Sequence, residues 1–266
     1  MDYRRAVRAI LLMAMTLCAS AASARDVWVI MGNAKGPVSG CSQVYTWTAD
    51  AYFHNVGTEA VSIKVIDSSN GGGPAAIDAI VLPQQAVALS RLFGARAPSL
   101  PLFVAHLAVD DSILGEGRLE YRYDFPCSTL PPLLGPVGKG SLPVFTELQP
   151  ALIPRPHFGT DLALQKARIN VAIYNDGNVM AVATVETRRP GCIGAAPERQ
   201  SVLIPPKTII QTTVKTPANC DVGDPLMPAW EVVTTVTVDQ PSLSYVSVVS
   251  NEQAPVTSFT AGTSGK

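Results

Sequence analysis

The sequence carries the same order of short β-strand signals twice. In each copy, a strand that ends in Asn is followed by a turn containing Gly and an alternating apolar run. An apolar residue before Pro comes next, and then Val-Asp with Leu four residues later. Such a repeat predicts domain number and fold class together, but it does not predict a chemistry. The landmarks are Asn55-Val56-Gly57, Leu82-Pro83, Val109-Asp110 and Leu114 in the first copy, and Asn175-Asp176-Gly177, Ile204-Pro205, Val238-Asp239 and Leu243 in the second.

The segments between these landmarks have the periodicity of strands. Residues 44–53 and 117–123 alternate apolar or aromatic side chains with polar ones, which indicates half-buried strands. Residues 102–109 form a continuous apolar run, typical of a strand buried on both faces. No segment keeps a helical apolar stripe over three turns, although residues 84–93 contain helix formers and can hold one turn of helix. We therefore expect about seven short strands per copy.

The first residues have the features of a secretory leader. Arg4, Arg5 and Arg8 precede an apolar core, and Ala22-Ser23-Ala24 is a small-residue cleavage site, so the mature chain is predicted to begin at Arg25. The apolar core is too short for the roughly 20 residues of a membrane span. Cys18 follows the bulky Leu17, which disfavours a lipid attachment site. The sequence thus predicts an exported protein that is periplasmic, exposed at the cell surface or secreted.

Composition excludes several functional classes. The formal net charge is −1, with 15% charged and 47% hydrophobic residues. A charge this small gives no electrostatic basis for binding nucleic acid or an anionic lipid surface. The hydrophobic content is well above that of disordered chains. The mature chain is therefore expected to be globular, without an integral membrane span.

Four cysteines remain after removal of the leader, namely Cys41, Cys127, Cys192 and Cys220. An even number in an oxidising compartment predicts structural disulfides, and four cysteines allow three pairings. We favour Cys41 with Cys127 and Cys192 with Cys220, because pairing within each copy requires no contact between domains. A zinc site is the alternative, but neither pair has close C-x-x-C spacing. His54, His106 and His157 are isolated in sequence.

The domain boundaries follow from composition. Residues 1–24 form the leader and 25–127 the first sandwich. Residues 128–141 are a Pro- and Gly-rich linker, and 142–253 the second sandwich, with 142–148 as its opening strand. Residues 254–266 are a flexible tail rich in Ser, Thr and Gly. The expected fold class is all-β, with two tandem immunoglobulin-like antiparallel β-sandwich domains.

A family resemblance supports this expectation. Trp47-Thr48-Ala49-Asp50 before Asn55-Val56-Gly57, and Arg168-Ile169-Asn170-Val171 before Asn175-Asp176-Gly177, resemble exported bacterial proteins with tandem immunoglobulin-like repeats. The resemblance implies an envelope or adhesion module and transfers no site residues. Cys41 and Cys127 bracket the first copy, whereas antibody domains link two inner strands.

The sequence contains no recognisable enzyme or cofactor motif, because neither H-E-x-x-H nor G-x-S-x-G is present. We therefore expect no catalytic, cofactor or metal site. Asp110, Asp111 and Glu116 are candidates for an acidic site, but a solvated turn with Asx hydrogen bonds explains Asp110, as it does Asp239 in the second copy. Gly71-Gly72-Gly73 lacks the following helix of a phosphate loop.

Two functions remain open. The first is a non-catalytic protein-interaction or structural module that binds an unknown protein. The second is a carbohydrate-binding or adhesive module that binds surface polysaccharide through exposed Tyr45, Trp47 and Tyr52. Burial of Trp28, Trp47, Tyr52 and Trp230 would exclude the second. Any specific activity is expected where the copies differ, in the loops around Gly71, Cys192 and Cys220.

Overall fold

The computed structural model describes residues 24–37, 44–69, 78–92, 102–123, 136–148, 155–161, 167–192, 194–215, 217, 231–250 and 260–262. Most of these residues are in β-strands, and every strand pairing among them is antiparallel. The prediction of an all-β protein is therefore confirmed. Residues 1–23 of the predicted leader lie outside the described residues, so the leader stays a prediction.

The first half of the molecule, residues 24–148, contains eight strands and one helical turn within its described part. Its sheet has the order β4-β3-β6-β1-β2-β7-β8, and β5 also pairs with β2. The helical turn α2 lies inside the segment 84–93, where the sequence predicts that a turn of helix can form. The elements are β1 Ala24–Pro37, β2 Val44–Asn55, β3 Val61–Ser68, β4 Asp78–Val81, β5 Ala86–Ala88, α2 Leu89–Leu92, β6 Phe103–Asp110, β7 Ile113–Tyr123 and β8 Pro136–Leu142.

Strand β1 joins two parts of this sheet. Its residues 24–31 pair with β6, and its residues 32–37 pair with β2. Gly32, at the change of partner, has a φ of 105°. Glycine adopts this conformation without the clash of a Cβ atom, so the strand can bend from one partner to the other.

The second half, residues 155–262, forms two four-stranded sheets. Their strand orders are β13-β10-β15-β16 and β12-β11-β14-β9. The strands are β9 Arg155–Asp161, β10 Ala167–Asn175, β11 Ala181–Arg188, β12 Glu198–Ile204, β13 Thr208–Thr213, β14 Glu231–Val238, β15 Ser242–Ser250 and β16 Thr260–Gly262.

The same pairing scheme occurs in both halves. Strand β2 pairs with β5 and β7 as β10 pairs with β13 and β15. Strand β3 pairs with β4 and β6 as β11 pairs with β12 and β14. The first and last strands of each half follow this scheme as well. Strand β1 pairs with β6 as β9 pairs with β14, and β8 pairs with β7 as β16 pairs with β15.

Three clusters of buried apolar side chains hold the strands together. One lies inside the first half and contains Val27 and Val29 of β1 with Phe53 of β2. A second lies inside the second half and contains Ile169 and Val171 of β10. Alternate residues of a strand point to opposite faces, and the intervening residues of β1 and β10 enter the third cluster.

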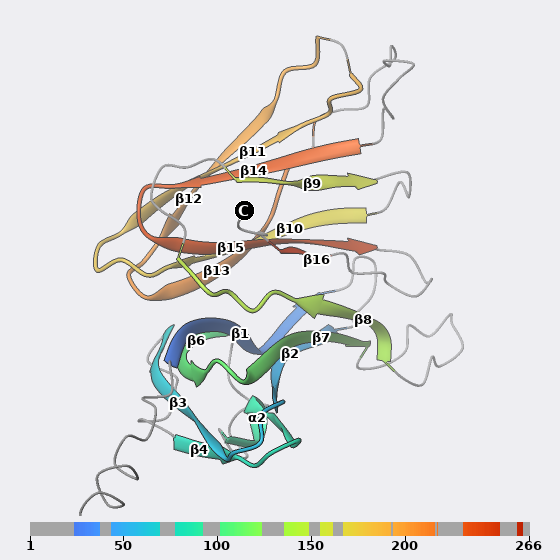
Figure 1. The fold of residues 1–266 in the computed structure, drawn as a ribbon. Coiled ribbons are helices and arrows are strands. Elements are labelled where there is room, and N and C mark those ends of the chain that lie inside the picture. Colours follow the sequence, from blue (N-terminus) through green and yellow to red (C-terminus); the bar gives the residue numbers. More distant parts are fainter. Residues whose placement is uncertain are drawn as a thin grey trace, which may run out of the picture.

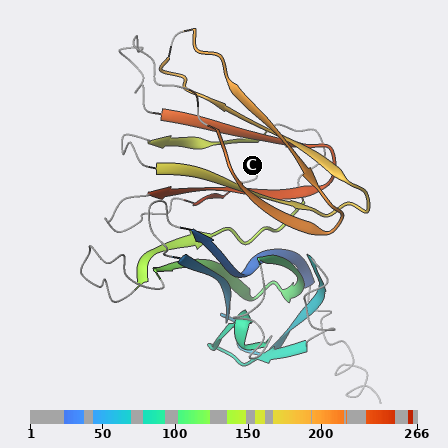
Figure 2. The ribbon, with the colours of Figure 1, turned by 180° about the vertical axis from the view of Figure 1, so that it is seen from behind.

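The third cluster joins the two halves. Trp28, Ile30 and Leu119 of the first half pack in it with Tyr174 and Tyr245 of the second. The sheet containing β10 and β15 therefore lies between the first half and the rest of the second half, as Figures 1 and 2 show. The apolar run at 102–109, predicted to be buried on both faces, is fully buried on one face of β6. On the other face Val104 is buried, whereas His106 and Ala108 are only partly buried.

The chain between the halves contains an edge strand beside the predicted linker. Residues 136–142, spanning the end of the predicted linker, form β8 and pair with β7. Phe145 exchanges two backbone hydrogen bonds with Trp28, at 2.8 and 3.0 Å. Strand β9, and not the segment 142–148, has the pairing that corresponds to β1. Residues 260–262 of the predicted tail form β16.

Candidate functional site

Two buried asparagines have equivalent places in the two halves. Asn55 and Asn175 end β2 and β10 and have no solvent exposure. Asn55 donates through Nδ2 to the carbonyls of Glu59 (2.7 Å) and Val81 (2.9 Å), and its Oδ1 accepts from the Gly57 amide. Because these bonds tie a turn to the end of a neighbouring strand, the asparagine organises the hairpin.

Asn175 makes the same contacts in the second half. Its Nδ2 donates to the carbonyls of Val179 (2.8 Å) and Ile204 (3.0 Å), and its Oδ1 accepts from the Gly177 amide at 2.8 Å. The repeated Asn-x-Gly pattern is therefore a structural motif that satisfies buried backbone groups.

The repeated aspartates have different contacts. The Asp110 carboxylate accepts bonds from the Ser112 amide (2.8 Å) and hydroxyl (2.7 Å), which is the predicted Asx turn and lowers the pKa of Asp110. Asp239 instead accepts from the Val182 amide on β11, at 2.8 Å. Of the candidate acidic site, Asp110 is thus used in a turn, and Glu116 accepts hydrogen bonds from Arg118.

Asp50 has a structural role as well. Its carboxylate accepts from the Ser90 amide (3.0 Å) and the Ser90 hydroxyl (2.6 Å), inside the helical turn α2. A carboxylate that binds an amide at the start of a helix satisfies a donor that the helix leaves open.

An aromatic pair lies on the first-half side of the contact between the halves. The rings of Trp28 and His106 are stacked, with centroids 4.4 Å apart and planes 7° apart. His106 Nε2 lies 3.1 Å from an oxygen of Asp26. His106, which is isolated in sequence, is therefore held by β1 on both its ring face and its ring edge.

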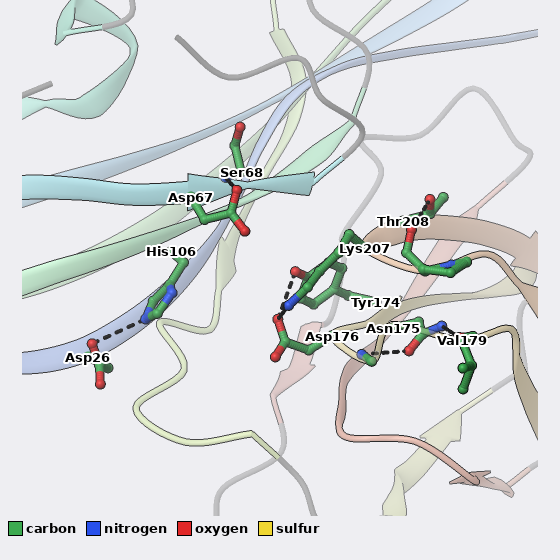
Figure 3. A network of polar contacts seen from close by, with 12 residues as sticks. Asp26, Asp67, Ser68, His106, Tyr174, Asn175, Asp176, Val179, Lys207 and Thr208 are labelled. Atoms are coloured by element: carbon green, nitrogen blue, oxygen red, sulfur yellow. Dashed lines mark hydrogen bonds and ion pairs between the residues drawn. The ribbon is translucent and has the colours of Figure 1, made fainter. Parts of the chain in front are cut away.

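A polar group of the second half lies across from His106 and Asp26, as Figure 3 shows. Tyr174 donates its hydroxyl to Asp176 (2.9 Å), and Lys207 binds the same carboxylate oxygen at 3.0 Å. Burial, followed by the hydrogen bond to Asp176 and the negative charges of Asp176 and Asp67, raises the pKa of Tyr174. The phenol therefore stays protonated and acts as a donor.

The candidate aromatic platform for a sugar is only partly described. The Arg118 guanidinium lies over the Tyr52 ring, 4.4 Å from its centroid, and also binds Glu116. This face of Tyr52 is thus covered by a protein side chain. Trp28 is buried, while the side chains of Tyr45 and Trp47, and the whole of Trp230, lie outside the described part.

Exposed apolar side chains gather on the outer face of the second half. Met180 is 51% exposed, Val182 41% and Leu203 63%. Val182 on β11 is directly paired with Leu203 on β12, and Met180 precedes Val182 by two residues. We call Val179, Met180, Val182 and Leu203 the distal patch, because Val182 and Leu203 belong to the sheet of the second half that contributes no residue to the cluster shared with the first half.

The first half lacks this patch at the corresponding positions. Ser62 occupies the place of Val182 and is paired with Ile80, as Val182 is paired with Leu203. Ile80 is 75% exposed, but its cross-strand neighbour is polar. The distal patch is therefore a place where the copies differ.

The predicted cysteine pairs lie mostly outside the described residues. Cys41, Cys127 and Cys220 belong to this group, as does the loop around Gly71. Cys192 is buried and disulfide-bonded. Its partner is not among the described residues, so the pairing scheme stays a prediction.

The described residues contain neither a metal-binding cluster nor a membrane-spanning helix. In the described part of the chain, no three His, Cys, Asp or Glu side chains are grouped closely enough to hold a metal ion. Within those limits, no helix has the length and apolarity of a membrane span.

Sequence reasoning missed the distal patch and the contact between the halves. The signal for the patch was present, since Val179-Met180 stands in a turn where the first copy has Glu59-Ala60. The contact between the halves had a weaker signal, namely the apolar residues on both faces of β1 and β10. No protein-family model, curated protein or solved structure matches this chain.

Proposed function

We propose that this chain is an exported, non-catalytic interaction module made of two tandem immunoglobulin-like β-sandwiches. It acts in the periplasm, at the cell surface or outside the cell, and it binds a partner protein through the distal patch. The observation that carries the proposal is the exposed cross-strand pair of Val182 and Leu203 with Met180 beside it. Grouped apolar side chains on a surface are typical of binding sites.

The contact between the halves supports the same function. Trp28 and Tyr174 belong to one buried cluster that spans both halves. A buried apolar contact restricts relative motion of two units more than a polar one does. The distal patch is therefore presented in a fixed orientation relative to the first half.

The test is a pull-down from the envelope fraction of the source cells, with the mature protein as bait. Met180→Asp and Val182→Asp place a charge in the distal patch at exposed positions. Ile80→Asp is the matched control, because Ile80 occupies the place of Leu203 in the first half. Thermal unfolding of each variant verifies that the fold is retained.

We expect the wild type and Ile80→Asp to retain the same partner, and the two patch variants to lose it. Equal capture by all four proteins would place the binding surface elsewhere. Recovery of the bait alone would count against an interaction module.

A further inference from the structure

The outer edge of β12 is a regular strand edge without a neighbour among the described residues. Strand β12 is terminal in its sheet and pairs only with β11, residue for residue from 198 to 204. We infer that β12 pairs antiparallel with β12 of a second copy of this chain, around a two-fold axis at Ser201. The two sheets then form one continuous sheet across the dimer.

The other sheet edges carry features that discourage such pairing. Strand β9 contains Pro156 and a register shift, and β8 begins with Pro136 and also has a shift. Strands β4, β5 and β16 have only four, three and three residues. Prolines, bulges and short length are the usual protections of an edge.

Strand β13 is the remaining terminal strand, and it is partly covered. Its residue Ile209 belongs to the buried cluster between the halves. By contrast, Glu198, Arg199, Ser201 and Leu203 of β12 are exposed. Among the described edges, β12 is therefore the one that is long, regular and accessible.

The sequence around β12 fixes the register of the proposed pairing. Pro197 precedes the strand and Pro205 follows it, each four residues from Ser201. Proline has no backbone N–H, so the ladder ends at these positions. Antiparallel pairing with Ser201 opposite Ser201 of the second copy places Pro197 opposite Pro205 and pairs all seven residues between them.

The side chains suit this register. Arg199 lies opposite Leu203 of the second copy, so its aliphatic stem covers the exposed leucine. Glu198 lies opposite Ile204, and Gln200 opposite Val202. No like charges face each other across the axis, which is a requirement for a stable pair. A two-fold axis makes both contacts identical, as in most homodimers.

This inference shares Leu203 with the distal patch, but it rests on the unpaired edge of β12 and is tested at other residues. Met180 and Val182 lie outside β12 and carry the test of partner binding, whereas Ser201 carries the test of self-association. The pull-down and the following measurements can therefore fail separately.

The first experiment is sedimentation velocity of the mature protein over a wide range of concentration. We expect the wild type to shift from monomer to dimer as concentration rises. Ser201→Lys and Ser201→Glu each place like charges across the axis and are expected to stay monomeric. An equimolar mixture of the two variants pairs opposite charges and is expected to dimerise again.

The second experiment tests the register by oxidative cross-linking. Ser201→Cys places two cysteines directly opposite each other, with Cβ atoms about 5 Å apart. Thr184→Cys is the matched control, because Thr184 is the exposed partner of Ser201 on β11, one strand in from the edge. On a non-reducing gel we expect a covalent dimer for Ser201→Cys alone.

Off-axis cysteines sharpen the same test. Arg199→Cys or Leu203→Cys alone leaves the two thiols about 13 Å apart along the strands, but a mixture brings them opposite each other. A covalent dimer is therefore expected only in the mixture. The inference stands only if the wild type dimerises and these cross-links follow the stated register. A monomer at every concentration, or any other cross-linking pattern, overturns it.

Discussion

Asn55 in the first half and Asn175 in the second end equivalent strands and bond the same kinds of backbone groups. Beside them, however, the two halves expose different residues. Ser62 and Ile80 form an exposed cross-strand pair in the first half, and Val182 and Leu203 form the corresponding pair in the second. The buried polar contacts are the same in both halves, whereas the outer faces differ.

This difference separates what the fold requires from what a partner can use. A buried asparagine that loses its bonds leaves several backbone groups unsatisfied, which is costly. An exposed residue on a sheet face changes stability little, so it is free to change with function. Three sets of substitutions test this view of the two halves.

The largest effect is expected at the contact between the halves. Trp28→Ala removes a buried ring that stacks on His106 and packs in the shared cluster. The loss is expected to be about 3–5 kcal/mol in the free energy of unfolding, as for other buried large-to-small changes. Because Trp28 connects the halves, we also expect urea unfolding to change from one transition to two.

Trp28→Phe is the control for this prediction. It keeps an aromatic ring against His106 and is expected to retain a single transition with a smaller loss. Two transitions in the wild type would show that the halves already unfold separately, and the contact between them would then be energetically minor.

The next effect compares the two asparagines. Asn55→Ala and Asn175→Ala each leave two or more backbone carbonyl groups, one of them buried, and one amide without their partner. We expect each to lower the free energy of unfolding by about 2–4 kcal/mol, by similar amounts in the two halves. Urea denaturation measures both. A large loss at one site only would mean that the two asparagines have the same geometry but contribute differently to the free energy of unfolding.

The sequence predicts the repeated parts of the fold better than the parts that join them. Asn, Gly and Pro at fixed order determine turns through local backbone preferences, and these landmarks reappear beside the ends of β2, β10, β4 and β12, although Val81 and not Leu82 takes the place of Ile204. The helical turn near Leu89 and the apolar strand β6 also follow from local composition.

The contact between the halves depends on long-range packing instead. Trp28 and Tyr174 are far apart in sequence, and neither strand pattern specifies that their outer faces meet. Residues 136–142 contain Pro and Gly that suggest a linker, yet β7 offers them an edge to pair with. In the sequence, the distal patch is visible only as a difference between the halves, because Val179-Met180 stands where the first half has Glu59-Ala60.

The smallest effect is expected at the two aspartates. Hydrogen bonds from Ser112 lower the pKa of Asp110, so its charged form stabilises the folded state. This contribution is present above the ordinary carboxyl pKa and is lost as pH falls through the lowered value. Asp110→Ala is expected to lower the free energy of unfolding by less than about 1.5 kcal/mol at neutral pH, and by less still in acid.

Asp239→Ala provides the comparison in the second half, because Asp239 binds the Val182 amide on another strand and forms no Asx turn. Urea denaturation from neutral to acidic pH should show that Asp110→Ala reduces the acid-dependent part of the stability. An unchanged pH profile in this variant would mean that the Ser112 bonds do not distinguish the charged from the neutral carboxyl. The conformation of the Asp110 turn would then not depend on its carboxylate. The neighbouring hairpin is already held by the hydrogen bonds of Asn55.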